Sequence, residues 1–476
     1  MHLLNRRAFL QTSLTATAVP AVIRCLSVAA ETLDGAHLAR PLPRQLVWQD
    51  CEVGAIFHFD MPLFGARAWS ARAAIRQTWD PKIYNPAKLD TDQWVEAAKA
   101  MGARYAIVTA THFNGFMQWQ SDLYPYGVRQ AAWRGGKGDL VRDFVDSCRR
   151  AKLRPGLYLS CFRNAWWKVD RYRVGYGKGG PRQAEFARTC ERMVEELCSR
   201  YGPLLQIWFD AGLIAPADGG PDVLPIVDKH QPDMVFYHSP QRREHRWIGN
   251  ESGHAGIPCW ATMPDLDAAE RAHKGRGAAW RQLLAHGDPD GSLWSPAMAD
   301  TVLRHHHWFW KPHTERTIEP RDRLVGFYYT SVGRNANLML GLTPDPDGLL
   351  PEPDCRRCAE LGTEIRRRFH KPVAHTKGTG AQLELPLPKP QKIDHIVLME
   401  DITHGERVRR YIIEGLVPGN RWQKLCDGLS VGHKRIQAFD AIEVAALRLR
   451  ITESVAAPRI RRLAACACGT PPPFRS

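Results

Sequence analysis

Between Gly54 and Pro344, short apolar runs alternate with segments of helical period, and this alternation constrains the fold more than any other feature of the chain. Continuous apolar runs suit strands that are buried on both faces, as in a parallel sheet. Repeated strand–helix units therefore predict a parallel β/α architecture. The clearest of these runs are GAIFHFD (54–60), YAIVTATHF (105–113), PGLYLSCF (155–162), LLQIWFDAG (204–212), MVFYHS (234–239) and NANLMLGLTPD (335–345).

The segments between the runs carry helix start and stop signals. In LDTDQWVEAAKAMG (89–102), Asp90 is a predicted N-cap, Gln93 completes a capping box, and Gly102 ends the helix. With this number of units over roughly 300 residues, a (β/α)8-like TIM barrel is favoured over a doubly wound sheet, and no Gly-x-Gly-x-x-Gly loop follows a predicted strand. Further helices are expected over 140–151, 183–200 and near 223–232.

Beyond Phe369 the pattern changes. KPVAHTKGTGAQLELPLPKPQK (371–392) is rich in Pro and Gly and does not read as a helix. The segments after it alternate apolar and polar residues, which predicts an antiparallel β-sandwich of about 100 residues. We therefore expect a catalytic barrel over 31–372 and a β-sandwich domain over 373–476. The alternating segments are IDHIVLMEDI, RVRRYIIEGLV, RWQKLCDGL, KRIQAFDAI and ALRLRITES.

The first thirty residues read as a targeting segment. NRRAFLQ (5–11) is a twin-arginine pattern, a mildly apolar stretch follows it, and small residues near Ala29 and Ala30 offer a cleavage site. The alternative is a frayed basic N-terminus. We expect a twin-arginine signal peptide over 1–30 and a periplasmic or secreted bacterial protein. No later run is long enough to span a bilayer, so no membrane anchor is expected.

Charge and cysteine content limit the possible partners. The formal net charge is +15, but the Arg residues are scattered and no recognition motif accompanies them, so a basic surface is favoured over a nucleic-acid partner. The pairs Cys355/Cys358 and Cys466/Cys468 could suggest a four-thiolate zinc site. The first pair lies on a predicted helix and Cys-x-Cys is poor zinc spacing. Structural thiols, with no metal and no cofactor, are therefore expected.

In a barrel, the residues at the strand ends converge on one mouth, where active sites are built. The residues at these ends include acids that are far apart in the sequence, among several histidines, and the chain has 16 Trp residues that could stack on sugar rings or pack the core. Two carboxylates without a metal motif favour glycoside hydrolysis. In its retaining form, one carboxylate attacks the anomeric carbon while the other donates a proton. The strand-end residues are His58, Asp60, His112, Phe162, Asp210, His238 and, after RREHRW, Glu251.

Several longer stretches carry a family resemblance over nearly all of the mature chain. Together they resemble glycoside hydrolase family 29, the α-L-fucosidases, especially the branch that favours α-1,3/1,4-linked fucose. The stretches are FHF (57–59), YNPAKLDTDQWVEAAKAMGARYAIVTATH (84–112), GKGDLVRDFVDSCRRAKLRPGLYLS (136–160), YGPLLQIWFDAG (201–212), RWIGNESG (246–253) and YYTSVGRNANLMLGLTPDPDGLL (328–350).

The resemblance implies roles for individual residues. Asp210 matches the family's nucleophile in its Trp-Phe-Asp segment, and Glu251 matches the branch's acid/base in its Gly-Asn-Glu segment. His58 and His112 match histidines that contact the fucose hydroxyls. The implied substrate is a fucosylated oligosaccharide or polysaccharide. Trp208 and Trp247, beside the two acids, are assigned to substrate binding, with core packing as the alternative.

The chain departs from the family pattern in the sugar-binding shell. THFNGF (111–116) has Phe113 in place of a second His and Asn114 in place of Asp. Phe113 removes a hydrogen-bonding partner for a sugar hydroxyl, which could change substrate choice as much as rate. Asp60 adds a possible acid at the mouth. WSARAAIRQTW (69–79) lacks the family's Glu, although we include Trp69 among the substrate-binding candidates.

Two alternatives stay open. Phe113 and Asn114 allow a hydrolase of the same mechanism that acts on another deoxy- or hexopyranoside. A catalytically silent carbohydrate-binding protein is the other alternative, although a pure binder need not keep both Asp210 and Glu251. The run LRHHHWFW (303–310) invites a metal interpretation. Consecutive histidines on a helix point in different directions, so we expect a polar surface with one pocket contact.

Overall fold

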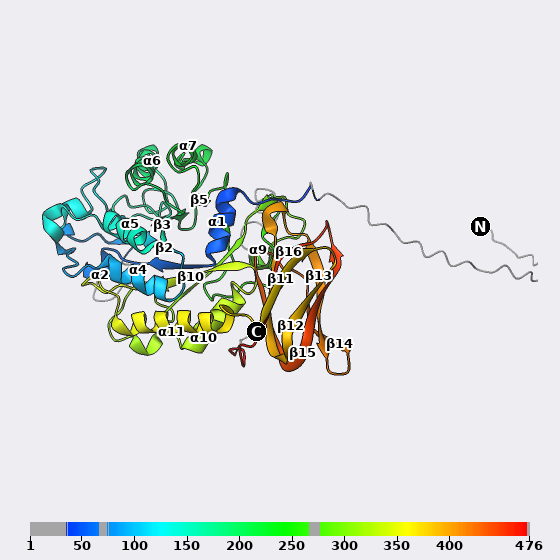
Figure 1. Cartoon of the computed structure of the whole chain (residues 1–476). Helices are drawn as coiled ribbons and strands as arrows, with labels where there is room; N and C mark the ends of the chain where they lie inside the picture. Colours follow the sequence, from blue (N-terminus) through cyan, green and yellow to red (C-terminus); the bar gives the residue numbers. More distant parts are fainter. Residues whose placement is uncertain (1–34, 36, 66–73, 75, 266–276, 474–476) are drawn as a thin grey trace, which may run out of the picture.

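The computed structural model describes residues 35, 37–65, 74, 76–265 and 277–473. An α/β barrel lies beside a C-terminal β domain (Figure 1). The predicted signal peptide and Trp69 fall outside the described residues. No helix of the described residues is long and apolar enough to cross a membrane.

The predicted (β/α)8-like barrel is confirmed. Eight strands form one sheet in which each neighbouring pair is parallel, with β5 and β6 at its two edges, so the barrel is nearly closed. The strands are almost entirely buried, as their apolar sequences require. In sheet order they are β5 (Val235–Tyr237), β4 (Gln206–Phe209), β3 (Arg154–Leu159), β2 (Tyr105–Thr109), β1 (Val53–Phe57), β10 (Ala336–Leu342), β9 (Ala297–Val302) and β6 (Arg246–Trp247).

Helices surround this sheet on the outside (Figure 1). Two helices have the predicted bounds, α5 (Leu140–Ala151) and α6 (Gln183–Arg200), because each places a continuous apolar stripe against the barrel. The others are α2 (Pro62–Gly65), α4 (Thr91–Ala100), α7 (Leu224–His230), α9 (Ala278–His286), α10 (Arg321–Thr330) and α11 (Glu352–Phe369).

At the start of α4, half of the predicted capping box forms. The Asp90 carboxylate accepts a hydrogen bond from the backbone N–H of Gln93 at 3.0 Å. The Gln93 side chain does not reach back to Asp90. It makes two hydrogen bonds with the backbone of Leu350, at 3.0 and 2.8 Å, and so ties the helix to the segment before α11. A tertiary partner has replaced the local one.

The amino-terminal end of the barrel is covered by α1 (Pro43–Cys51), which lies between the two domains (Figure 1). Trp48 is fully buried, and its Nε1 donates to Gln206 Oε1 of β4 at 2.9 Å. Its ring stacks on His245 with the centroids 4.6 Å apart. Trp48 therefore helps to fill this end of the barrel.

The C-terminal domain is antiparallel β, as predicted. Its six strands form the order β11-β16-β12-β15-β13-β14 around one apolar core. A two-stranded pair, β7 (Thr262–Met263) and β8 (Leu293–Trp294), belongs to the preceding region. The six strands are β11 (Ala374–Thr379), β12 (Gln382–Glu400), β13 (Val408–Val417), β14 (Arg421–Gly428), β15 (Arg435–Ser454) and β16 (Arg459–Cys466).

Strand boundaries differ from the sequence pattern in this domain. The Pro-rich stretch 371–392 contains β11 and the first part of β12. Proline cannot donate to a strand ladder, and the register between β12 and β15 indeed shifts between Pro386 and Gln391. The segments KRIQAFDAI and ALRLRITES join into the single strand β15, and β16 was not among the predicted segments.

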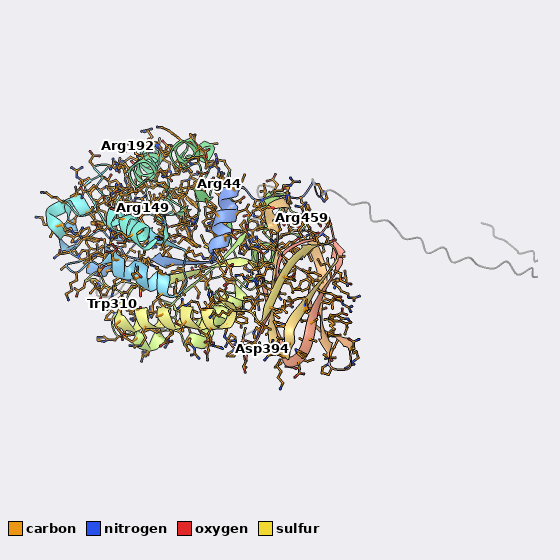
Figure 2. The ribbon with its side chains drawn as sticks, viewed as in Figure 1. Arg44, Arg149, Arg192, Trp310, Asp394 and Arg459 are labelled. Atoms are coloured by element: carbon orange, nitrogen blue, oxygen red, sulfur yellow. The ribbon has the colours of Figure 1, made fainter. Side chains whose placement is uncertain are left out.

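Arginine side chains are distributed over the molecule, as the scattered sequence positions suggest. Figure 2 labels Arg44 on α1, Arg149 on α5, Arg192 on α6 and Arg459 on β16. The basic excess is thus shared between both domains.

Candidate active site

A cavity of about 540 Å3 opens at the carboxyl end of the barrel strands. The structure places six of the predicted site residues around it: His58, His112, Phe113, Trp208, Asp210 and Glu251. They come from strand ends and loops far apart in the sequence, which the closed sheet brings to one mouth. The other lining residues are Ile56, Tyr158, Asp300, Trp308 and Phe309, which the sequence analysis did not single out.

Asp210 directly follows β4, and its backbone N–H still bonds to Leu159 of β3, so the strand fixes where its carboxyl group points. Tyr158 on β3 donates its hydroxyl to Asp210 Oδ2 at 2.8 Å. Burial raises the pKa of Asp210, and the nearby charge of Glu251 adds to this rise. The hydrogen bonds from Tyr158 and from the Ala211 backbone act against it.

Glu251 lies in the loop after β6. Its Oε2 accepts a hydrogen bond from Trp308 Nε1 at 2.9 Å, so the acid is oriented by a neutral donor. The loop is held at Gly253, whose N–H donates to the Asp300 carbonyl of β9 at 3.0 Å. Gly253 has φ +71° and lies against Phe327, a position that a side chain would strain.

Asp300 is a third carboxyl group in the cavity. Its Oδ1 accepts from Trp247 Nε1 at 2.7 Å, and burial together with the charges of Glu251 and Asp210 raises its pKa well above the usual range. The sequence signal for Asp300 was weak, because the apolar run AMADTV that carries it was not assigned to a strand. Tyr158 was missed because it lies inside the predicted run 155–162, from which only Phe162 was taken as a strand-end candidate.

An aromatic wall surrounds these acids. The His112 ring stacks on Tyr158 with the centroids 5.3 Å apart, and the His58 ring lies 5.1 Å from Trp308. Burial lowers the pKa of His58 to about 3 and that of His112 well below its usual value, so both rings are neutral. Neutral imidazoles can donate to or accept from sugar hydroxyls without adding charge.

Other residues named in the sequence analysis, Phe162 among them, lie outside the lining of the cavity. Asp60 is fully buried and is not among the lining residues, and its Oδ1 accepts from the Met61 backbone at 2.8 Å. Trp247 contacts a lining residue, because its Nε1 donates to Asp300. Asn114 donates to the Gln77 carbonyl at 2.6 Å and accepts from Tyr126, which makes it a support for the loop and not a sugar contact. His238, another strand-end candidate, is also absent from the lining.

The histidine run is not helical, contrary to the expectation. Residues 303–310 form a bridge and turns after β9, because His306 takes a left-handed conformation with φ +62°. His305 bonds to Glu319 at 2.8 Å. The pocket contacts from this run are Trp308 and Phe309 instead of a histidine.

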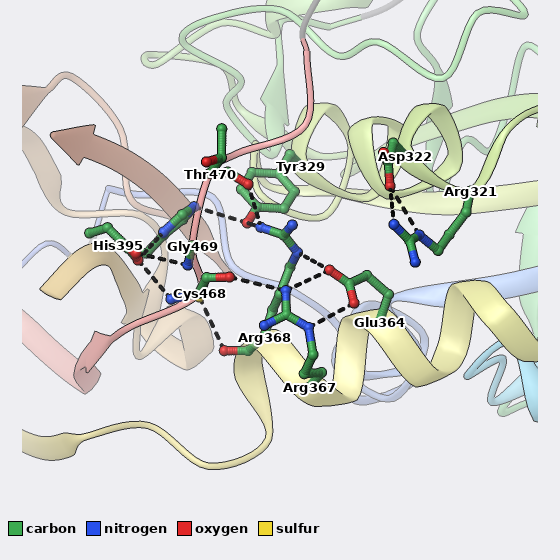
Figure 3. Close-up of polar contacts among 11 residues, drawn as sticks. Arg321, Asp322, Tyr329, Glu364, Arg367, Arg368, His395, Cys468, Gly469 and Thr470 are labelled. Atoms are coloured by element: carbon green, nitrogen blue, oxygen red, sulfur yellow. Dashed lines mark hydrogen bonds and ion pairs between the residues drawn. The ribbon is translucent and has the colours of Figure 1, made fainter. Parts of the chain in front are cut away.

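Among the described residues, Asp394, His395 and Cys468 have ligand atoms within 4.8 Å of one another, a spacing that could hold a metal ion. Protein groups already contact these atoms: His395 Nδ1 bonds Asp394, its Nε2 bonds Tyr329, and Cys468 Sγ donates to the Arg368 carbonyl. Figure 3 shows this network where α10 and α11 meet the C-terminal domain. Its contacts fit an interdomain link without requiring a metal.

Comparison with known proteins identifies the family. The Alpha-L-fucosidase family matches residues 77–367. Alpha-L-fucosidase 1 of Arabidopsis thaliana is 28% identical over 89% of this chain and 87% of its own. A putative α-L-fucosidase structure from Bacteroides thetaiotaomicron is 45% identical, covering 90% of this chain and 99% of that one, with a TM-score of 0.87.

A glycoside hydrolase 29 family member from an unknown rumen bacterium is also similar. It is 27% identical, and the match covers 92% of this chain and 78% of the other, with a TM-score of 0.76. The family model, the full-length relatives and the shared fold agree, and this chain belongs to the α-L-fucosidases of glycoside hydrolase family 29.

Proposed function

We propose that this glycoside hydrolase releases α-L-fucose with retention of configuration, using Asp210 as nucleophile and Glu251 as acid/base. One observation carries the proposal: the two carboxyl groups, from different loops, line a single cavity of about 540 Å3. Retention requires the two carboxyl groups to be about 5–5.5 Å apart, whereas inversion needs about 6.5–9.5 Å.

In the first step, Asp210 attacks the anomeric carbon and the glycosidic bond breaks. Glu251 gives its proton to the leaving oxygen. In the second step, Glu251 takes a proton from water, and the hydroxyl attacks the anomeric carbon and releases Asp210. Tyr158 holds Asp210 by a 2.8 Å hydrogen bond, and Trp308 holds Glu251 by one of 2.9 Å.

We further propose a preference for α-1,3/1,4-linked fucose, on the resemblance of the GNE segment that carries Glu251. Phe113 supports the alternative of a different deoxy- or hexopyranoside, because it lines the cavity and offers no hydrogen bond to a hydroxyl. A panel of aryl glycosides, followed by α-1,2-, α-1,3- and α-1,4-fucosylated oligosaccharides, separates these possibilities. Faster cleavage of another aryl glycoside than of the fucoside would contradict the fucose assignment.

The stereochemical proposal is tested by following hydrolysis of an aryl α-L-fucoside by proton NMR. Retention predicts that α-L-fucose forms first and that the β-anomer grows only by mutarotation. If β-L-fucose forms first, the enzyme inverts, and Asp210 would have to activate water instead of attacking carbon.

We also propose export by the twin-arginine route, as the NRRAFLQ segment suggests. Replacing both Arg6 and Arg7 by Lys should retain unprocessed precursor in the cytoplasm. Unchanged appearance of the mature protein outside the cytoplasm would contradict this route.

Finally, we propose that the chemistry resides in residues 31–372 and that residues 373–476 are not catalytic. In support, the cavity lining runs from Ile56 to Phe309. A chain ending at residue 372 that remains soluble and binds substrate normally, yet cannot turn it over, would contradict this division.

A further inference from the structure

A second cavity, of about 420 Å3, lies between the barrel and the C-terminal domain. The barrel contributes the segment 257–259 and residues 334–335 that precede β10. The C-terminal domain contributes residues 427–431 and Arg435, from the hairpin that joins β14 to β15. None of these residues belongs to the lining of the proposed active site, and nothing in the hydrolysis of a fucoside uses them.

Two arginines meet in this cavity. Arg334 and Arg435 form an isolated antiparallel bridge, so their backbones run side by side and both side chains reach the lining. Both residues are half-buried. Within the described part of the chain, neither guanidinium has an ion pair. Arg334 donates to the Ala255 carbonyl at 2.8 Å, and Arg435 to the Gly333 carbonyl at 3.4 Å.

Two like-charged guanidinium groups that are half-buried side by side repel each other and lose part of their hydration. Burial and the neighbouring charge of Arg435 lower the pKa of Arg334 to about 10, so it remains charged at neutral pH. Buried arginines elsewhere in the described residues differ in this respect: Arg304 bonds the Asp354 carboxylate at 2.9 Å, whereas Arg246 donates to the Leu284 and Ser295 carbonyls. Two half-buried like charges are tolerated most easily when an anion lies between them.

The acid in the lining does not neutralise the pair. Asp427 is exposed, and its Oδ2 lies 3.2 Å from Lys424 Nζ, so its charge already has a cation. Guanidinium groups match the planar or tetrahedral oxygens of carboxylates and sulfates better than they match other ligands. The charge of the cavity therefore selects for an oxyanion.

Two exposed apolar side chains flank the arginines. Ile257 is 53% exposed and Leu429 is 39% exposed, and both line the cavity, one from each domain. An inorganic ion makes no use of such groups. A sugar ring, by contrast, presents C–H groups beside its polar substituents and would cover both side chains.

We propose that Arg334 and Arg435 form a second carbohydrate site, which binds a saccharide through a sulfate or carboxylate substituent while Ile257 and Leu429 contact its ring. Because the two domains each supply one arginine and one apolar residue, binding also joins the domains. For an enzyme of this family, such a site would hold an anionic glycan away from the catalytic mouth.

The test measures binding by titration calorimetry with four probes: glucose 6-sulfate, glucuronic acid, glucose and sodium sulfate. At least one of the two anionic sugars should bind, and glucose and sodium sulfate should each bind at least about tenfold more weakly than that sugar. Arg334→Gln and Arg435→Gln should each weaken its binding by about tenfold or more, since each removes a charge-assisted hydrogen bond. Arg421→Gln, an exposed arginine on β14 outside the cavity, is the charge-matched control and should bind normally.

Hydrolysis of an aryl α-L-fucoside reports whether each variant is folded, and it should stay unchanged because neither arginine lines the active site. Arg435→Lys replaces Arg435→Gln if the latter fails to fold, and should also weaken binding. Leu429→Ala should weaken binding of the anionic sugar but not of sodium sulfate. Equal affinity in the wild type and both Gln variants would overturn the site. Equal affinity for sodium sulfate and the anionic sugars would overturn its assignment to a saccharide.

Discussion

The carboxyl groups that line the cavity and two carboxyl groups near the domain interface, Glu52 and Glu364, have opposite surroundings. In the cavity, Asp210, Glu251 and Asp300 accept hydrogen bonds from the neutral donors Tyr158, Trp308 and Trp247. Near the interface, Glu52 and Glu364 meet cations, whereas Glu406 accepts hydrogen bonds from Asn335 and from the Ala261 backbone. Glu52 lies 2.5 Å from Lys434 Nζ and 3.2 Å from His433 Nε2, and Glu364 bonds Arg367 and Arg368 on α11.

The pKa values follow this difference. Burial raises those of Asp210 and Asp300, with no cation close enough to reverse the effect. Burial also acts to raise that of Glu52, but Lys434 and His433 more than reverse it and lower the pKa. The hydrogen bond from Arg367 is the main cause that lowers the pKa of Glu364 to about 2. The cavity thus holds carboxyl groups with raised pKa values and no cation partner, as catalytic acids often have, whereas Glu52 and Glu364 are kept ionised by theirs.

The largest effect should come from removing the carboxyl group of Asp210. Asp210→Gly should lower kcat for an aryl α-L-fucoside by at least about 10⁴-fold, because no other group replaces the nucleophile. Azide should restore part of the turnover and give a fucosyl azide, detected by mass spectrometry. Asp218→Gly, an exposed acid nearby, is the control and should keep normal activity. Azide rescue by Asp60→Asn instead of Asp210→Gly would show that the nucleophile is misassigned.

Removing Glu251 should have a smaller effect that depends on the leaving group. Glu251→Ala should reduce kcat/KM by about 10²–10⁴-fold for a fucosyl oligosaccharide, and much less for an aryl fucoside that needs little protonation. The measurement is a series of aryl fucosides with increasing leaving-group pKa. A uniform loss across the series would mean that Glu251 only binds substrate.

Tyr158→Phe tests the neutral donor to Asp210. In the wild type, the hydrogen bond from Tyr158 lowers the pKa of Asp210, so removal of the hydroxyl should raise that pKa further. The nucleophile must be ionised, so the acidic limb of the kcat/KM profile should move to higher pH. We expect about a tenfold loss near neutral pH, since hydrogen bonds to charged groups contribute about 1.5–3 kcal/mol. Trp247→Phe, which removes the donor to Asp300, is the comparison. An unmoved acidic limb in Tyr158→Phe would contradict this coupling.

The sequence predicts the barrel well because its signal is local. The apolar stripe of α6 and the buried run of β4 each follow from their own residues. The C-terminal strands were less predictable, since β15 is continuous only because β12 and β13 pair along its length.

The residues of the candidate site could likewise be predicted from the sequence only where their signal is local. Asp210 and Glu251 stand at recognisable positions in the sequence, and the fold brings them to one cavity. Asp300 and Trp308 could not be anticipated in this way, because their importance lies in contacts with Trp247 and Glu251 from distant segments. Asp60 also follows a predicted strand, but its side chain is fully buried and is not among the residues that line the cavity.

At the interface, Glu52→Gln should reduce stability and leave chemistry intact. It leaves Lys434 without its buried partner, which should lower the free energy of unfolding by about 3 kcal/mol at pH 7. The Glu52 pKa is lower in the folded chain, so this contribution is present above pH 4.5 and is lost as the pH falls through the folded pKa. Urea unfolding at several pH values measures it. Glu96→Gln, whose exposed carboxylate lies 3.6 Å from Lys99, should change stability by less than about 1 kcal/mol.

The smallest effect is expected for Asp60→Asn, which tests whether every unpaired acid near the cavity is catalytic. Burial raises the pKa of Asp60 to about 8, so its carboxyl group is mostly protonated at neutral pH and resembles an amide in charge and size. Activity on an aryl fucoside should therefore change by less than about threefold, in contrast to Asp210→Gly.

The raised pKa of Asp60 also makes the stability of the folded chain depend on pH in a definite direction. Between the unfolded value of 3.8 and the folded value of about 8, the folded chain holds a proton that the unfolded chain releases, so this group lowers stability as the pH rises. The Asn variant lacks that slope and should gain stability relative to the wild type from pH 4 to pH 8. A constant stability difference over this range would mean that Asp60 is ionised in the folded protein and finds a cation or a substrate group there.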